Sequence, residues 1–222
     1  MAKCFILAGN YGSGKTEIAL NMSLAFSEKG KTVLADMDIV NPYFRSAEHG
    51  GLLEEHGIRL IAPTYANTLV DVPAISAEVF AAFSYDYAVF DAGGDPVGTS
   101  VLGSISGHFK NQETQFYYVV NARRPLQKTA EQVVLMLELI RAKARMPITG
   151  VINNTNLARE TVVDDLLFGR EVCLEVSQKT GIPIAYTSGE KRVLEEYAAK
   201  TGEESLLELN IYTRPNWLDS TV

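Results

Sequence analysis

Short apolar runs recur along the chain and are separated by longer segments with helical periodicity. In each run the apolar residues are consecutive and do not alternate with polar ones, which is typical of strands covered on both faces of a sheet. We therefore predict strands at residues 3–9, 31–38, 58–63, 86–93, 115–121, 148–154 and 182–188.

The segments between these runs have the pattern of amphipathic helices. Residues 15–29 form one predicted helix, and residues 128–145 form another, with one apolar face made of Val133, Val134, Leu137, Ile140 and Ala144. A third is predicted from Thr161, which has an acidic residue three positions later, to Gly181. The stretch 190–210 also has a helical pattern. Strands that alternate with helices predict an α/β fold, a doubly wound and mainly parallel sheet with helices on both faces.

The chain has 222 residues, of which 46% are apolar and 21% are charged, so it is long and apolar enough to bury a large core. No internal repeat, low-complexity tract or linker divides it, and we predict a single domain over residues 1–222. Residues 64–73 have the weakest periodicity and are expected to form a long loop.

Charge and cysteine content exclude several classes of protein. The formal net charge of −7 argues against nucleic acid as a partner. Cys4 and Cys173 lie far apart in apolar surroundings, which indicates buried thiols rather than a disulfide framework or a CxxC metal site. No apolar stretch could span a bilayer, and residues 190–210 are acidic where a membrane-targeting helix would be basic. We expect a cytoplasmic protein without a signal peptide or membrane attachment.

The stretch GNYGSGKTE, residues 9–17, follows the first predicted strand and opens the first predicted helix. Gly9, Gly14, Lys15 and Thr16 match the pattern G-x-x-x-x-G-K-[ST], in which the loop backbone and the helix N-terminus bind phosphate oxygens. The lysine ammonium contacts the β- and γ-phosphates, which makes Lys15 a catalytic candidate, and the threonine hydroxyl is a ligand of Mg²⁺. The predicted nucleotide-binding residues of this P-loop are Gly9, Asn10, Tyr11, Gly12, Ser13, Gly14, Lys15, Thr16 and Glu17.

Three aspartates stand at the carboxyl ends of predicted strands, where ligands bind in doubly wound sheets. Asp36 and Asp38 are two positions apart and so lie on the same side of an extended chain. Asp91 ends a strand and precedes a glycine pair that can bring a backbone N–H to the γ-phosphate. Together with the P-loop and Thr16, these carboxylates predict a metal and water site at this edge of the sheet.

The succession of P-loop, DMDIVNP, FDAGG and GVINN resembles that of the MinD, ParA, Mrp and nitrogenase-iron-protein group of P-loop ATPases, of the SIMIBI class. The resemblance covers nearly the full chain and implies ATP and Mg²⁺ as cofactors. It implies that Asp38 positions the attacking water or Mg²⁺, with Asp36 as its companion, and that Asp91 is the Mg²⁺-linked aspartate. It further implies that Gly94 is the glycine of the second switch region and that Asn154 meets the adenine edge.

The P-loop departs from that group at one position. Most members have KGGxGKT, whose first lysine reaches across a dimer to the partner's nucleotide, whereas this chain has Asn10 there. Its GSGKT ending instead resembles the loops of signal-recognition GTPases and of nickel-metallochaperone GTPases, which read guanine with N/T-K-x-D. Residues 153–156 are NNTN, with Asn156 where the aspartate should be. Because an amide cannot accept both guanine N–H bonds, ATP is predicted over GTP.

Slow intrinsic hydrolysis is expected without the lysine at position 10, because a cation at the transferring phosphate can be worth about 10³–10⁵ in rate. Arg45 and the pair Arg123–Arg124 are the candidates to supply it. The histidines have no metal-ligand spacing and are interpreted as surface or packing residues; they are His49, His56 and His108.

The leading hypothesis is a Mg²⁺-dependent ATPase with slow turnover that acts as a nucleotide-driven switch. It would couple the state of residues 36–46 and 91–100 to a protein partner, such as a metalloenzyme under maturation, or to a homodimer. One alternative is an ATP-dependent small-molecule ligase or amidase of the cobyrinic-acid-amidase and dethiobiotin-synthetase branch, with a pocket from Tyr43, Arg45, Tyr65 and Asn67. A metallochaperone-like GTPase is another. A binding module without catalysis conflicts with the presence of both Asp38 and Asp91.

Overall fold

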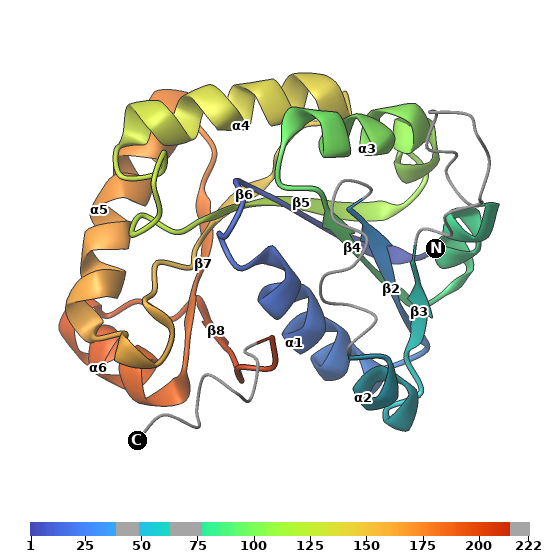
Figure 1. The fold of residues 1–222 in the computed structure, drawn as a ribbon, viewed down its shortest axis with the longest axis horizontal. Helices are drawn as coiled ribbons and strands as arrows, with labels where there is room; N and C mark the ends of the chain where they lie inside the picture. Colours follow the sequence, from blue (N-terminus) through green and yellow to red (C-terminus); the bar gives the residue numbers. More distant parts are fainter. Residues whose placement is uncertain (39–48, 63–76, 214–222) are drawn as a thin grey trace.

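The computed structural model of the chain describes residues 1–38, 49–62 and 77–213, and its centre is one eight-stranded sheet (Figure 1). All neighbouring strands are parallel, in the order β3-β2-β4-β1-β5-β6-β7-β8. The strands are β1 Lys3–Ala8, β2 Thr32–Met37, β3 Arg59–Ile61, β4 Tyr87–Ala92, β5 Glu113–Val120, β6 Gly150–Asn153, β7 Ile184–Gly189 and β8 Leu206–Glu208. The predicted α/β fold with a parallel sheet is confirmed, and each predicted strand overlaps an observed one.

Helices cover both faces of the sheet, which gives three layers (Figure 1). Alternate residues of one strand serve the two faces: Cys4, Ile6 and Ala8 of β1 pack in one buried cluster, while Leu7 packs with Ile18 in the other. The first cluster lies under α3 Pro96–Phe109, α4 Ala130–Ala144 and α5 Val163–Thr180; the second lies under α1 Lys15–Ser27 and α2 Gly50–Glu55. Two short 3₁₀ helices, Ala77–Ser84 and Ala158–Glu160, complete these layers. No helix among the described residues is long and apolar enough to cross a membrane.

Helix α3 has no counterpart among the predicted helices, because three glycines interrupt its apolar pattern. Asp95 caps its first turn by accepting a hydrogen bond of 2.6 Å from the N–H of Gly98, and Pro96 occupies the first helical position. Gly103 lies where α3 crosses α4, and a Cβ there would overlap the carbonyl oxygen of Lys143. The glycines that interrupt the helical pattern in the sequence therefore permit α3 to approach α4 closely.

The stretch 190–210 is not one helix, contrary to the prediction. Helix α6, Lys191–Thr201, ends at Gly202, whose φ of 69° is the left-handed conformation that favours glycine. The chain then forms β8, which pairs with β7 at the edge of the sheet. The apolar residues of β8 also fit helical spacing, so the sequence pattern alone did not separate the two elements.

Helix α5 ends at Gly181 as predicted, but it begins later than the predicted cap at Thr161. The carboxylate of Asp165 accepts a hydrogen bond of 2.9 Å from the N–H of Val162 and caps the first turn. The hydroxyl of Thr161 instead accepts from the N–H of Leu157 at 2.9 Å and closes the preceding turn. The predicted long loop at 64–73 lies outside the described residues, as does part of the range 1–222 over which a single domain is predicted.

Candidate functional site

The P-loop connects β1 to α1 and requires glycine at two closely confined positions. Gly9 has a φ of 152°, and a Cβ on it would overlap the carbonyl oxygen of Val119 in β5. Gly14 caps α1 in the left-handed conformation with a φ of 90°, and a Cβ on it would overlap the side chain of Asn154. The loop therefore curls tightly over the ends of β5 and β6 and leads into the N-terminus of α1. The first N–H groups of a helix have no acceptor within the helix and can bind phosphate oxygens.

Lys15 is 8% exposed, and its ammonium group donates a hydrogen bond of 3.3 Å to the carbonyl oxygen of Asn10. The loop after β4 lies against the same group: a Cβ on Gly94 would be 3.3 Å from Lys15 Nζ and 3.1 Å from the backbone nitrogen of Tyr11. The P-loop and the loop that begins at Asp91 thus meet at the lysine ammonium.

The predicted metal-site residues lie next to this contact. Thr16 donates a hydrogen bond of 2.6 Å to Asp91 Oδ2, and Asp36 of β2 is the register partner of Asp91 in β4. The backbone N–H of Asp38 donates to Asp36 Oδ1 at 2.9 Å. A Cβ on Gly93 would be 3.5 Å from Asp38 Oδ1. The structure therefore brings together three carboxylates and one hydroxyl from three separate segments of the sequence.

Asp91 has a strongly perturbed ionisation. Burial and the neighbouring Asp36 carboxylate raise the pKa of Asp91 to about 7, although the Lys15 ammonium and the Thr16 hydroxyl act in the opposite direction. Its Oδ1 is buried and has no hydrogen-bond partner among the described residues. A carboxyl group with this environment is costly for the fold and is typical of a site that uses its charge.

These residues fit a magnesium ion. Thr16 and Asp91 supply the oxygen ligands that Mg²⁺ prefers, and the unpaired Asp91 Oδ1 is available to bind a metal-bound water. The described residues contain no group of three or more His, Cys, Asp or Glu side chains suited to hold a metal by themselves. Mg²⁺ in nucleotide sites commonly keeps several waters and takes phosphate oxygens as further ligands.

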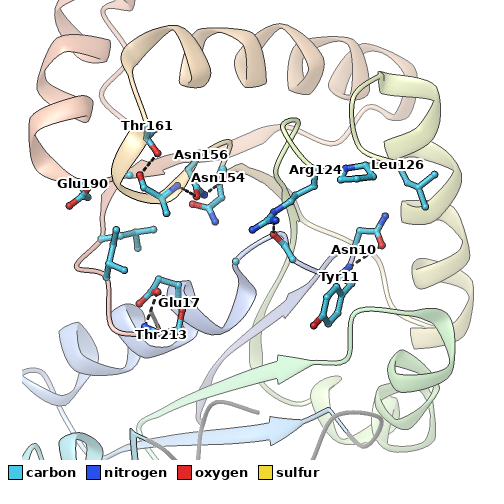
Figure 2. A pocket seen from close by; sticks show the side chains of 17 residues that line it. Asn10, Tyr11, Glu17, Arg124, Leu126, Asn154, Asn156, Thr161, Glu190 and Thr213 are labelled. Carbon is cyan, nitrogen blue, oxygen red and sulfur yellow. Dashed lines mark hydrogen bonds between the residues drawn. The ribbon is translucent and has the colours of Figure 1, made fainter. Parts of the chain in front are cut away.

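A pocket of about 510 Å³ opens on the other side of β1, toward β5, β6 and β7 (Figure 2). Its walls come from the P-loop, the loops that follow β5, β6 and β7, and the segment after β8. They consist of Asn10, Tyr11, Gly12, Gly14, Glu17, Arg124, Pro125, Leu126, Asn154, Asn156, Ala158, Thr161, Gly189, Glu190, Leu209, Ile211 and Thr213. The P-loop thus lies between this pocket and the three aspartates.

Asn154 lines the pocket, but its amide is already engaged. Its Nδ2 donates to the carbonyl oxygen of Ser13 at 2.7 Å, and its Oδ1 accepts from the hydroxyl of Ser188 at 2.9 Å. Asn156 donates to the carbonyl oxygen of Asn154 at 2.7 Å and accepts from the N–H of Ala158 at 3.1 Å. Asn154 therefore supports the P-loop from β6, and its contact with an adenine edge stays a prediction.

The candidate arginines have different surroundings. Arg123 forms an ion pair of 2.7 Å with Asp165 and lies 4.6 Å from the ring of Phe168, so α5 holds it. Arg124 reaches the P-loop, where its Nε donates to the carbonyl oxygen of Gly12 at 3.2 Å (Figure 2). Arg45 lies outside the described residues, as do Tyr43, Tyr65 and Asn67.

The cysteines were predicted to be buried thiols, and the histidines to be surface or packing residues. Cys4 and Cys173 are both buried, and burial raises the pKa of the Cys4 thiol to about 12. His56 bonds to the carbonyl of Leu52, and the ring of His108 lies 4.7 Å from that of Phe80. No sequence motif predicted that the segment after β8 lines the pocket, as Leu209, Ile211 and Thr213 do.

The strand order, the three layers and the P-loop between β1 and α1 define the fold of a P-loop NTPase. Solved structures with this fold include cell division protein FtsY from Thermotoga maritima, which is 19% identical with a TM-score of 0.57. The match covers 86% of this chain and 63% of that one. The signal recognition particle receptor FtsY from Elizabethkingia anophelis is 17% identical with a TM-score of 0.53, over 86% of this chain and 60% of that one. FtsY from Mycoplasma mycoides is 20% identical with a TM-score of 0.54, over 83% and 60%.

This chain thus spans about three fifths of the length of the FtsY structures that it matches. These structures share the α/β P-loop fold that was predicted from the sequence. No known protein-family pattern matches the chain, and no curated protein sequence does. At these identities the likeness establishes the fold.

Proposed function

We propose that the chain is a Mg²⁺-dependent ATP-binding protein that hydrolyses ATP slowly and acts as a nucleotide-driven switch for a protein partner. The observation that carries this proposal is the meeting of Lys15, Thr16, Asp91 and Gly94. A γ-phosphate bound at Lys15 would contact the P-loop and the loop after β4 at once. Loss of the γ-phosphate would therefore change the contacts of the loops at the ends of β2 and β4. Switching by hydrolysis requires such a change.

The proposed residue roles follow from this geometry. Lys15 neutralises the β- and γ-phosphates, Thr16 and Asp91 hold Mg²⁺ directly or through water, and Asp38 orients the attacking water. Gly94 lies in the loop that packs against Lys15, and its backbone N–H would donate to the γ-phosphate. The metal would supply charge neutralisation at the transferring phosphoryl group.

The choice of ATP rests on the amide at position 156, since guanine recognition needs a carboxylate that accepts two N–H bonds. Its side chain is also satisfied by the backbone of residues 154 and 158. The small-molecule ligase alternative gains no support from the described residues, because the side chains proposed for its substrate lie outside them.

An exposed apolar rim supports the proposal of a protein partner. Tyr11 and Leu126 are each 65% exposed, and both line the pocket beside the P-loop (Figure 2). Large apolar side chains at the edge of a ligand site are typical of a surface that another protein covers. A homodimer and a different protein are both compatible with this rim, and we propose that the nucleotide controls its occupation.

Two measurements test the proposal. Phosphate release from ATP in Mg²⁺ should be slow in the wild type and lost in Asp38→Ala, while Lys15→Ala should abolish tight nucleotide binding. Retained nucleotide affinity in Lys15→Ala would refute the assignment. Light scattering should then show a change of mass or shape between an ATP analogue and ADP, alone or with a co-purified partner. An equal mass and shape in both nucleotide states would contradict the switch.

A further inference from the structure

The segment after β8 runs along α1, the helix whose N-terminus is the phosphate site. Asn21, in the second turn of α1, is 8% exposed and bonds to Asn210 in both directions. Its Oδ1 accepts from the N–H of Asn210 at 2.8 Å, and its Nδ2 donates to the carbonyl oxygen of the same residue at 2.8 Å. A side-chain amide that pairs with one peptide unit in this way fixes the backbone as a neighbouring strand would.

Glu17 holds the same segment one turn closer to the phosphate site. Its Oε1 accepts from the N–H of Tyr212 at 2.7 Å. Its Oε2 accepts from the N–H of Thr213 at 3.1 Å and from the Thr213 hydroxyl at 2.7 Å (Figure 2). Glu17 directly follows the P-loop threonine, so the segment is attached to α1 within one turn of the proposed phosphate site. Charge-assisted bonds of this kind are among the stronger ones in proteins.

These bonds leave one side of the segment facing the pocket. Leu209, Ile211 and Thr213 alternate along the chain and all line the pocket, while the intervening backbone groups bond to α1. Leu209 is 6% exposed and packs in the buried cluster under α1, whereas Ile211 is only partly buried. Ile211 thus presents an aliphatic surface that has room for a ligand.

The position of this surface indicates which part of a nucleotide it would meet. Thr16 bonds to Asp91 on the β4 side of β1, so the metal and the γ-phosphate belong on that side. The nucleoside must then extend to the other side of the P-loop, where the pocket lies between the ends of β5 to β7 and the segment after β8. A purine has flat, weakly polar faces, which aliphatic side chains cover without distinguishing adenine from guanine.

We propose that residues 209–213 form the nucleoside-side wall of the nucleotide site, with Ile211 as the contact to the base and Glu17 as the positioning residue. This inference rests on the proposed nucleotide binding and extends it to a part of the chain that carries no nucleotide-binding motif. The predicted place of Glu17 in the site is thereby given a specific role, which is to hold the wall rather than to touch phosphate.

Isothermal titration with ADP and with inorganic tripolyphosphate separates the nucleoside wall from the phosphate site. Ile211→Ala is expected to weaken ADP binding about five- to tenfold, the effect of losing one buried aliphatic contact, and to leave tripolyphosphate affinity unchanged. Glu17→Ala should weaken ADP at least as much without weakening tripolyphosphate, and Glu17→Gln should recover part of the loss because one acceptor oxygen remains. Lys15→Ala should weaken both ligands. Leu139→Ala, at a 44% exposed leucine of α4, is the matched control and should bind both as the wild type does.

The other outcomes would contradict the nucleotide binding, the wall formed by residues 209–213 or the positioning role of Glu17. If the wild type binds neither ligand, the proposed nucleotide binding is wrong. If the wild type binds both and Lys15→Ala neither, but Ile211→Ala binds ADP normally, the wall is wrong and the nucleotide site stands. A parallel loss of ADP and tripolyphosphate in Ile211→Ala also overturns the wall, because it indicates general damage to the fold. Wild-type ADP affinity in Glu17→Ala overturns the positioning role.

Discussion

The hydroxyl of Thr16 donates a 2.6 Å hydrogen bond to the carboxylate of Asp91, and this bond joins the first turn of α1 to the end of β4. The two residues are 75 positions apart in the chain. In a nucleotide-binding protein of this fold, the same two oxygen atoms would face one Mg²⁺ ion. The bond therefore holds the two groups that we propose as metal ligands near each other. The second oxygen of this buried carboxyl has no hydrogen-bond partner among the described residues.

Asp91→Asn should stabilise the protein without nucleotide and abolish Mg²⁺-dependent hydrolysis. The pKa of Asp91 is raised to about 7 from the ordinary value of 3.8, so ionisation favours the unfolded chain as the pH rises from 3.8 to 7. The destabilisation by ionised Asp91 is absent below this pH range and fully present above it. Asp91→Asn lacks this destabilisation at every pH. We expect the Tm of Asp91→Asn to exceed that of the wild type only slightly at pH 4 and by the largest amount at pH 8. Each kcal/mol of added free energy of unfolding corresponds to about 2–4 °C in Tm.

Thermal unfolding at several pH values, followed by circular dichroism, measures this difference. Asp95→Asn is a useful control, because Asp95 also follows β4 but caps α3 by accepting from the N–H of Gly98. Its replacement should not reproduce the pH-dependent gain. An Asp91→Asn protein with the same Tm advantage at pH 4 and pH 8 would contradict the raised pKa.

Arg123→Ala and Arg124→Ala should separate stability from activity. Arg123→Ala removes the partner of Asp165, whose side chain is 4% exposed, and should lower the free energy of unfolding by about 1–3 kcal/mol. Arg124 is exposed and touches the P-loop through Gly12, so its removal should change stability by less than about 0.5 kcal/mol. If Arg124 supplies the cation that the missing lysine would provide, Arg124→Ala should lower turnover by about tenfold or more.

Urea unfolding and phosphate release, measured on both variants, give the two readouts. Turnover that is unchanged in Arg124→Ala, with and without a partner, would exclude this arginine as the replacement cation. A larger stability loss in Arg124→Ala than in Arg123→Ala would contradict the assignment of Arg123 to α5.

The different contacts of Arg123 and Arg124 could not be predicted from the sequence. The sequence predicted both as candidates, and only the turn after β5 decides that one faces Asp165 and the other faces the P-loop. By contrast, the parallel sheet and the cluster of carboxylates could be predicted, since strand ends in such a fold lie at one edge. Asp36 and Asp91 are register partners for that reason.

The wall after β8 could not be predicted, because no local pattern records it. Glu17 and Thr213 are 196 positions apart, and a single glutamate after a P-loop has no expected partner. The predicted helix at 190–210 even concealed the strand that leads to the wall. Helix α3 was not predicted for another reason. The glycines that allow α4 to pack closely against α3 also weaken the helical pattern of α3 in the sequence.

Gly94→Ala should slow hydrolysis with little effect on stability. The new methyl group would lie 3.1 Å from the backbone of Tyr11 and 3.3 Å from the Lys15 ammonium, so the loop after β4 must move away from the P-loop. We expect about a tenfold loss in phosphate release, because the N–H of Gly94 no longer reaches the γ-phosphate. Gly107→Ala is the matched control: a Cβ there meets no atom within 4 Å, and the change should stabilise α3 by about 0.5–1 kcal/mol. Equal hydrolysis rates in the two variants would argue against a catalytic approach of Gly94.

Asn154→Ala should reveal whether this amide supports the P-loop or reads the base. The side chain joins the Ser13 carbonyl to the Ser188 hydroxyl, so its loss leaves a buried P-loop oxygen without a donor. If support of the loop is its main role, affinity should fall by a similar factor for ATP, GTP and tripolyphosphate, because all three bind through the same loop. If Asn154 meets the adenine edge as the family resemblance implies, ATP affinity should fall more than GTP affinity. Competition binding with the three ligands measures the ratio directly. From the two bonds already made by the amide, we expect the uniform loss, and a change confined to ATP would show that the amide turns toward the nucleotide when it binds.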